Sequence, residues 1–356
     1  VLTFLGPFCS HFRLTNTDIA NSDNTNGYYI IESNDFVYNP RKSADAPYGP
    51  ISSYQYPEAG IVSPLYLCFR AKREINPLYF EWYFRSSTWH RYIYMSGDSG
   101  ARHDRVSIKD DVFFAMPINV PSAKEQERIS LFLDAIERRI ETQRTLVETL
   151  KKYKRGLLNK LFSNINSNIY PTVYLSEVAD FLQGLTYSPS DVSVSGYLVL
   201  RSSNIQNGML SFDDCVYVDK KVDESLQVKC DDVIMCVRNG SKNLVGKTAL
   251  IPPNMPMTTW GAFMMIIRSK LNDTYIFHYL NSQMFFSQVF KDTGTATINQ
   301  ITKGILNECR LPLPPETERK QISKMLSSFD AKIQNAEKCL ATLVNLKKAL
   351  LQQLFI

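Results

Sequence analysis

A long internal repeat restricts this sequence to a duplicated architecture. Ile118–Phe162 aligns without a gap on Leu311–Phe355, so that each residue lies 193 positions before its counterpart. A proline stands near the start of both copies, at Pro121 and Pro314, and both copies close on the pattern Leu-Leu-x-x-Leu-Phe. Self-similarity at a fixed spacing is typical of repeated structural units. The sequence therefore predicts two related halves.

Both copies carry apolar residues at alternating steps of four and three, which is the a/d pattern of a coiled coil. At about 1.5 Å per residue, a helix over Ile129–Leu161 would be roughly 50 Å long, which is more than one turn of DNA at about 34–36 Å. We expect the two helices to pack antiparallel, because each must leave one domain and approach the other. The expected seam residues are Ile129, Leu133, Ile136, Ile140 and Leu150 in the first copy, and Ile322, Leu326, Phe329, Ile333 and Leu343 in the second.

A lysine interrupts the apolar pattern at the same slot of both copies, at Lys154 and Lys347. A lysine in a core position costs stability and can fix the register or the partner of a coiled coil. The alternative is a side chain that runs along apolar surface to reach solvent at a frayed helix end. Both interpretations stay open at this stage.

The repeat continues into the globular parts with a slightly different shift. Asp35–Arg41 lies on Asp232–Arg238, and Arg70 pairs with Arg268, each after an apolar run. Tyr174–Val178 has no earlier counterpart, so we expect the first domain to lack about a strand's worth of residues at its start. The order along the chain is domain, helix, domain, helix.

The expected fold class is α+β, with two mixed α/β domains in a pseudo-two-fold repeat and two long antiparallel coiled-coil helices between them. Short β-branched and aromatic runs such as Asp232–Val237 and Phe263–Ile267 predict strands, whereas Tyr275–Phe286 favours helix. The expected boundaries are 1–117 for the first domain, 118–165 for the central helix, 166–310 for the second domain and 311–356 for the last helix.

Composition narrows the class of protein. A length of 356 residues suits two domains, and a net charge of +5 is too mild to identify a partner. The seven cysteines are scattered and form no C-x-x-C pair, which favours a reducing cytoplasm, and the four histidines show no zinc-ligand spacing. Neither a membrane span nor a signal peptide is expected, and the missing initiator Met indicates an incomplete N-terminus.

The sequence offers no recognisable catalytic centre. Gly246-Lys247-Thr248 resembles the end of a phosphate-binding P-loop, but that motif needs a glycine where Ser241 stands and a helix where Ala249–Pro253 follows. Dinucleotide, hydrolase-elbow and zinc-protease motifs are absent, as is the Asn/Asp-Pro-Pro-Tyr/Phe motif of amino-methyltransferases. No carboxylate cluster supports a nuclease.

Polar and basic loops occupy equivalent positions in both halves. Arg can bond the O6 and N7 atoms of guanine, and Asn can bond adenine, so such loops can read the major groove of DNA. For any one residue a turn-forming role is the simpler interpretation, and most true contacts would go to phosphates. The candidates are Arg41, Lys42 and Ser43 opposite Arg238, Asn239, Ser241 and Lys242; Arg102, His103 and Arg105 opposite Thr295, Thr297, Asn299 and Gln300; and Arg201 with Asn204, which follow the strand expected over Tyr197–Leu200.

Taken together, the chain resembles the specificity subunit of a type I restriction-modification system over essentially its whole length. The short first domain departs from the pattern of that family. The resemblance rests on the duplicated helix entry Pro121–Ser130 and Pro314–Ser323, on the helix endings Gly156–Phe162 and Ala349–Phe355, and on Asp35–Arg41 with Ser63–Tyr66.

The resemblance implies two target-recognition domains, each of which reads one half of a bipartite site in double-stranded DNA, with the paired helices as a ruler for the spacer. It implies two methyltransferase subunits that bring S-adenosylmethionine, and restriction (motor-nuclease) subunits that bring ATP and magnesium. This chain itself would bind no cofactor, no metal and no membrane, and would catalyse nothing. The main alternative is a coiled-coil scaffold that binds protein partners without reading DNA.

Overall fold

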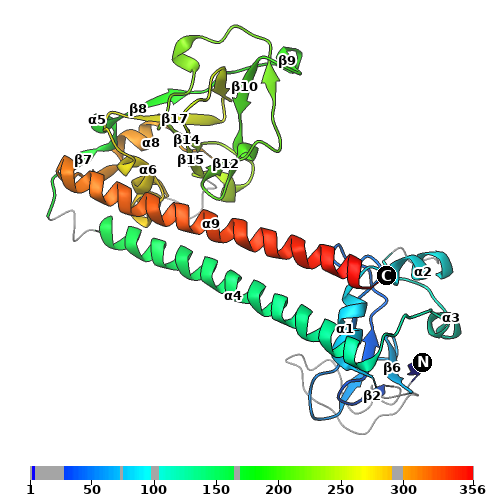
Figure 1. Cartoon of the computed structure of the whole chain (residues 1–356). Helices are drawn as coiled ribbons and strands as arrows, with labels where there is room; N and C mark the ends of the chain where they lie inside the picture. The colour runs from blue at the N-terminus through cyan, green and yellow to red at the C-terminus, as the bar shows by residue number, and fades with distance from the viewer. Residues whose placement is uncertain are drawn as a thin grey trace. The chain divides into compact units, whose positions relative to one another are not determined.

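The computed structural model describes residues 28–72, 75–97, 104–163, 169–290 and 300–355, together with the backbone of residues 2–4. It forms two compact units: unit 1 holds Val1–Thr145 and Glu337–Ile356, and unit 2 holds Leu146–Ala336. The long helices α4 (Ala123–Leu161) and α9 (Glu316–Leu354) each contribute residues to both units (Figure 1).

Unit 1 is built on an antiparallel sheet in the order β1-β6-β3-β4. Helix α1 begins at Pro77, where the Asn76 side chain accepts a hydrogen bond from the Tyr79 backbone N–H at 3.2 Å and caps the helix. The elements of unit 1 besides the long helices are β1 (Leu2–Phe4), β2 (Tyr29–Ile31), β3 (Phe36–Tyr38), β4 (Ile51–Ser53), β5 (Gly60–Val62), β6 (Leu67–Ala71), α1 (Pro77–Arg85), α2 (His90–Ser96) and α3 (Asp110–Phe114).

The core of unit 1 is rich in aromatic side chains. Strand residues at alternate positions point to one face, and the Phe36 ring stacks on the Phe69 ring with 5.5 Å between centroids. The Tyr38 ring stacks on Phe113 of α3 in the same way, at 5.2 Å. Trp82 and Trp89 are 2% exposed and fill the space between the sheet and the helices. Large rings bury much area per residue, so a small sheet still encloses a packed core.

Unit 2 contains a sheet of the same kind in the order β15-β14-β17-β8, and a second sheet in the order β16-β10-β13-β9. Its elements are β7 (Thr172–Tyr174), α5 (Leu175–Val178), β8 (Ala179–Gln183), β9 (Val192–Ser193), β10 (Tyr197–Leu200), β11 (Ile205–Gln206), β12 (Met209–Leu210), β13 (Tyr217–Val218), β14 (Val233–Cys236), β15 (Thr248–Leu250), β16 (Thr258–Trp260), β17 (Met264–Ser269), α6 (Tyr275–Leu280), α7 (Gln283–Val289), α8 (Lys303–Glu308) and β18 (Arg310–Pro312), with the 3-10 turns η2 (Pro189–Asp191), η3 (Ser202–Asn204), η4 (Glu224–Leu226) and η5 (Lys242–Leu244).

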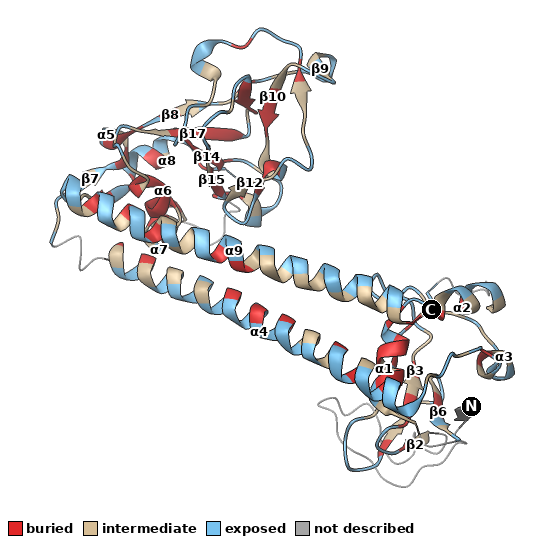
Figure 2. Ribbon diagram, viewed as in Figure 1, coloured by how far each residue is buried: buried red, intermediate tan, exposed pale blue. Residues whose placement is uncertain are grey.

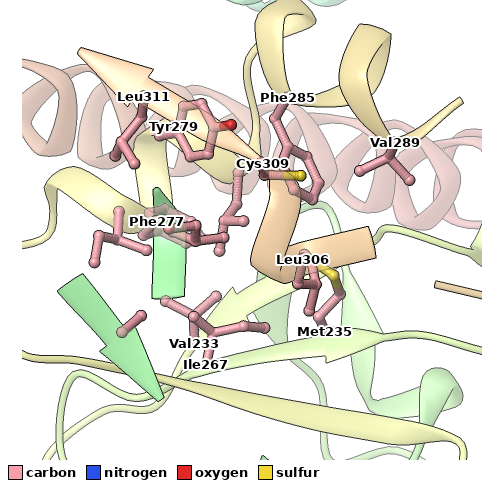
Figure 3. Close-up of a cluster of buried hydrophobic side chains, with 14 of the residues drawn as sticks. Val233, Met235, Ile267, Phe277, Tyr279, Phe285, Val289, Leu306, Cys309 and Leu311 are labelled. Atoms are coloured by element: carbon pink, nitrogen blue, oxygen red, sulfur yellow. The ribbon is translucent and has the colours of Figure 1, made fainter. Parts of the chain in front are cut away.

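The sheet of β14 and β17 is buried on both faces. Val233 and Met235 pack with residues of α6, α7 and α8, such as Phe277, in the cluster that Figure 3 shows. The alternate residues Ile234 and Cys236 pack on the other face, in a cluster with Trp260 of the second sheet. A strand that is apolar on both faces reads as a continuous apolar run, which is why Asp232–Val237 shows no alternation.

In unit 2, the two long helices run antiparallel. Phe162, just after α4, packs on Tyr275 and Tyr279 at 5.1 and 5.7 Å between ring centroids. Tyr275 also donates its hydroxyl proton to the Pro312 carbonyl at 2.8 Å, shortly before α9 begins. The end of α4 and the start of α9 therefore meet at one place, and Lys154 forms an ion pair with Asp330 further along both helices.

Unit 1 repeats this arrangement with the roles of the helices exchanged. Phe355, just after α9, packs on Tyr79 and Tyr83 at 5.4 and 5.9 Å between ring centroids. Lys347 Nζ lies 2.7 Å from Glu137 Oε2. Glu137 matches Asp330 under the 193-residue shift, so each seam lysine binds the equivalent acid of the opposite helix. Both lysines are mostly buried and paired, so neither runs out to solvent at a frayed helix end. Their role in fixing the register stays a prediction.

The predicted seam residues are buried or partly buried positions of the long helices, which Figure 2 colours red and tan. Leu133, Ile140, Leu326 and Ile333 are buried, and the remaining six are partly buried. The apolar a/d pattern therefore identified the packed face of both helices.

Some expected elements need adjustment. The single helix expected over Tyr275–Phe286 is two helices, α6 and α7, because the Ser282 side chain accepts from the Phe285 N–H at 3.3 Å and starts a new helix. Within the described part of the chain, no helix combines the length and the apolarity needed to cross a membrane.

Candidate nucleic-acid interface

In unit 1, two loops that are far apart in the sequence lie against each other. Arg41 and Arg105 form an isolated antiparallel β-bridge. The Val106 N–H donates to the Pro40 carbonyl and the Lys42 N–H donates to the Asp104 carbonyl, both at 2.8 Å. Arg41, Lys42 and Ser43 are exposed, and Arg105 is partly exposed. The contact gathers basic side chains at the end of strand β3.

Unit 2 repeats this contact with different side chains. Arg238 and Gln300 form the antiparallel bridge, and the Ile301 N–H donates to the Val237 carbonyl at 2.7 Å. Val237 matches Pro40 and Ile301 matches Val106, so the same backbone hydrogen bond joins the same two loops in both units. Their equivalent placement in the two domains, expected from the repeat, is confirmed for the described residues.

A buried carboxylate holds the base of the loop in each unit. Asp232, 2% exposed, binds Arg268 of the neighbouring strand through both oxygens, at 2.8 and 2.7 Å. The Lys229 N–H also donates to this carboxylate at 2.7 Å. The hydrogen bonds that Arg268 donates to Asp232 raise the pKa of Arg268, so its guanidinium stays charged.

Asp35 and Arg70 form the same bidentate pair in unit 1, at 2.6 and 2.8 Å, with the Glu32 N–H as the backbone donor at 2.7 Å. Two planar groups joined by two hydrogen bonds fix both the distance and the angle between strands. Strands β3 and β14, which follow Asp35 and Asp232, therefore fix the starting points of the loops that carry Arg41 and Arg238.

The comparison with known proteins agrees with this duplicated frame. A family model described as the type I restriction modification DNA specificity domain matches residues 170–344. The EcoKI specificity subunit of Escherichia coli is 28% identical over 171 residues, which are 46% of this chain and 36% of that protein. The StySPI specificity subunit of Salmonella potsdam is 28% identical over 176 residues, which are 47% of this chain and 38% of that protein.

Residues 170–344 of this chain therefore carry a type I DNA specificity domain.

Solved structures show the same fold. One chain, from a study of complex assembly and conformational transition in the type I restriction-modification system, has a TM-score of 0.61 at 18% identity, over 92% of this chain and 83% of that one. The type I restriction-modification S subunit from M. genitalium has a TM-score of 0.56 at 14% identity, over 100% and 93%. The alignments with the EcoKI and StySPI subunits span less than two fifths of those proteins, 36% and 38%.

Among the candidate residues, Arg238 is exposed and its side chain is available for a ligand. Its guanidinium lies over the Phe263 ring, 5.4 Å from the centroid, and has no hydrogen-bond partner among the residues that the structure describes. Arg201 is less available, because it binds the Asp214 carboxylate at 2.8 Å. Lys42, Lys242 and Gln300 are exposed.

Several other candidates shape the loops. Ser43 Oγ accepts the Ala46 N–H at 3.1 Å and closes a turn, and Ser241 stands at the start of the turn η5. Asn239 uses both ends of its amide: its oxygen accepts the Ser241 N–H at 3.0 Å and its nitrogen donates to Ser202 Oγ at 3.1 Å. Asn239 thus ties the Arg238 loop to the turn η3.

The expectation that Asn204 contacts DNA is wrong. Its side chain is 0% exposed. Its oxygen accepts the Arg201 N–H at 2.9 Å, and its nitrogen donates to the carbonyls of Ser211 and Asp214 at 3.0 Å each. A buried amide with all of these bonds made braces the loop and cannot reach a base without opening it. Arg102, His103, Thr295, Thr297 and Asn299 lie outside the described residues.

The structure also excludes a P-loop at Gly246-Lys247-Thr248, as expected. Gly246 has φ +88° in a turn, and Thr248 begins strand β15, where a P-loop would begin a helix. Thr248 is 2% exposed, and its hydroxyl accepts from the Asn281 amide at 2.8 Å. Among the described residues, no group of three or more His, Cys, Asp and Glu side chains could hold a metal ion.

Two apolar residues beside the loops were not among the sequence candidates. Phe263 supports Arg238, and Leu65 stands at the matching position of unit 1. The repeat aligned both positions, but an apolar residue at a predicted strand gave no sign that its side chain faces solvent. Their exposure, about 60% in each case, could only be seen in the structure.

Proposed function

We propose that this chain recognises a bipartite sequence in double-stranded DNA, with one half-site read by each unit, and that it performs no catalysis itself. One observation carries the proposal: the same two loops meet in both units, with Arg41 beside Arg105 in one and Arg238 beside Gln300 in the other. A shared frame with different side chains is what two readers of different half-sites require.

The side chains at these loops suit the major groove. An Arg guanidinium can donate two hydrogen bonds to the O6 and N7 atoms of guanine, and a Gln amide can bond the N6 and N7 atoms of adenine. The lysines beside them, Lys42 and Lys242, are exposed and suit phosphate contacts, which hold a protein on the duplex without reading sequence.

The proposed partners and cofactors are inferred from the similarity to type I specificity subunits. We propose that the paired helices α4 and α9 set the length of the unread spacer and bind two methyltransferase subunits, which supply S-adenosylmethionine. Restriction subunits would supply ATP and magnesium, and this chain would bind none of the three. The complex would work in the cytoplasm, where its DNA target lies.

Selection from randomised duplex DNA tests the proposal, with the chain and its methyltransferase partners as bait. We expect two enriched half-sites at a fixed spacing. Affinity should fall on the order of a thousandfold between 50 and 200 mM salt if about six phosphates are neutralised, because bound counterions are released. No enriched sequence, together with salt-independent partner binding, would favour a coiled-coil scaffold instead.

A further inference from the structure

Leu65 and Phe263 occupy matched positions in the two units, and both are exposed. Leu65 lies three residues before Cys68, and Phe263 lies three residues before Ile266. Cys68 and Ile266 pair with equivalent residues of β3 and β14. The two side chains are 61% and 60% exposed, whereas Cys68 and Ile266 are completely buried.

Phe263 contacts the proposed DNA-reading loop through its backbone and its ring. Its carbonyl accepts the N–H groups of Val237 and Arg238 at 3.0 and 3.2 Å. Its ring lies under the Arg238 guanidinium. A guanidinium stacked on a ring keeps all of its N–H donors free in the plane of the group. The ring therefore orients Arg238 and leaves its donors available.

A single exposed apolar side chain is ordinary on a protein surface. Here, the exposure recurs at one position of a duplicated fold. Phe263 contacts the loop that carries Arg238, and Leu65 lies two residues before Leu67, which pairs with Tyr38 shortly before Arg41. The side chain also changes from Leu to Phe between the units, just as Arg105 changes to Gln300. The two units therefore differ at this position, whereas both keep an arginine at the equivalent positions Arg41 and Arg238.

We propose that Phe263 in unit 2 and Leu65 in unit 1 each contact the 5-methyl group of a thymine in the half-site that their unit reads. This proposal rests on the proposed function. The thymine methyl is the apolar feature of the major groove, and apolar side chains recognise it by contact. In unit 2, the Phe263 ring contacts the methyl group. Arg238, whose guanidinium lies over that ring, donates hydrogen bonds to the edge of a neighbouring base.

Replacement of single thymines by deoxyuridine tests this contact, because it removes only the methyl group. We expect one thymine in the half-site of unit 2 whose replacement weakens binding about fourfold, the free energy of burying one methyl group. The Phe263→Ala variant should bind the thymine and deoxyuridine duplexes equally well. Leu65→Ala should lose the methyl effect in the other half-site only.

The matched control is Val194→Ala, which shortens another exposed apolar residue of unit 2, 96% exposed, and should keep the full methyl effect. Thermal unfolding of each variant checks that the fold is intact. The proposal is overturned if no deoxyuridine weakens wild-type binding, or if Phe263→Ala keeps the fourfold difference. Failure of the proposed function looks different, because the wild-type complex would then select no half-site at all.

Discussion

The two units present the same loops on different cores. The strands of unit 1 bury aromatic rings such as Phe36 and Phe69, whereas the paired strands β14 and β17 of unit 2 bury aliphatic and Met side chains such as Met235. The bridge between the two loops is nevertheless repeated. The position of the loops is therefore set by strand register and by the buried Asp–Arg pair, and the core composition can change around them.

The buried pairs are alike in geometry but differ in solvent access. Arg268 is 23% exposed, whereas Arg70 is 45% exposed and also binds Glu32 at 2.7 Å. Removal of the carboxylate partner of an arginine costs folding stability only where water cannot replace that partner. The same substitution should therefore have unequal effects in the two units.

The largest effect is expected for Asp232→Ala, which leaves Arg268 largely buried without its partner. We expect a loss of about 3 kcal/mol in the stability of unit 2, typical of a broken buried pair. Asp35→Ala should cost unit 1 about 1 kcal/mol, because Arg70 keeps water and Glu32. Hydrogen exchange of peptides that cover β14 and β3 measures both losses. Equal losses would mean that solvent access does not distinguish the pairs.

The second contrast is a buried histidine of unit 2 whose matching position in unit 1 holds a tryptophan. His278 of α6 is 0% exposed and lies against α9, with Ser327 Oγ at 3.3 Å and Asp330 at 3.9 Å. The matching position of unit 1 is Trp82, which donates to Asp134 of α4 at 3.0 Å. Burial and then the nearby positive charge of Lys154 lower the pKa of His278 to about 3.

Unit 2 should therefore lose stability in mild acid. The unfolded chain binds a proton at His278 near pH 6.5, but the folded unit does not bind it until about pH 3. Stability falls through this window by about 1.4 kcal/mol per pH unit, so about 2 kcal/mol between pH 7 and pH 5. His278→Gln should remove this part of the loss, as measured by hydrogen exchange of α6 at both pH values. An unchanged pH dependence in the variant would assign the loss to other groups.

The sequence predicted the long helices and the repeated strands well, because both depend on local periodicity. The a/d pattern gave the packed faces of α4 and α9, and the run Tyr197–Leu200 is strand β10 as predicted. The matched ion pairs of Lys154 and Lys347 follow from the same repeat. Features that recur at fixed spacing along one element can be read from one sequence.

The sequence predicted the individual site residues less well, because their roles depend on partners distant in the chain. Asn204 carries an amide that could bond a base, yet this amide donates its hydrogen bonds to the carbonyls of Ser211 and Asp214. Asn239 is held by Ser202, which precedes it by 37 residues. A polar residue in a loop can serve the loop or a ligand, and only its hydrogen-bond partners distinguish the two.

Arginine substitution in both units tests the central claim, which is that each unit reads its own half-site through the same loop. In selections from randomised DNA, Arg238→Ala should cost roughly 1–3 kcal/mol and relax one half-site only, as expected for a bidentate contact to a base. Arg41→Ala should relax the other half-site only. Loss of specificity in both half-sites from either variant would contradict the account, as would a uniform loss with a shallower salt slope, which marks a phosphate contact.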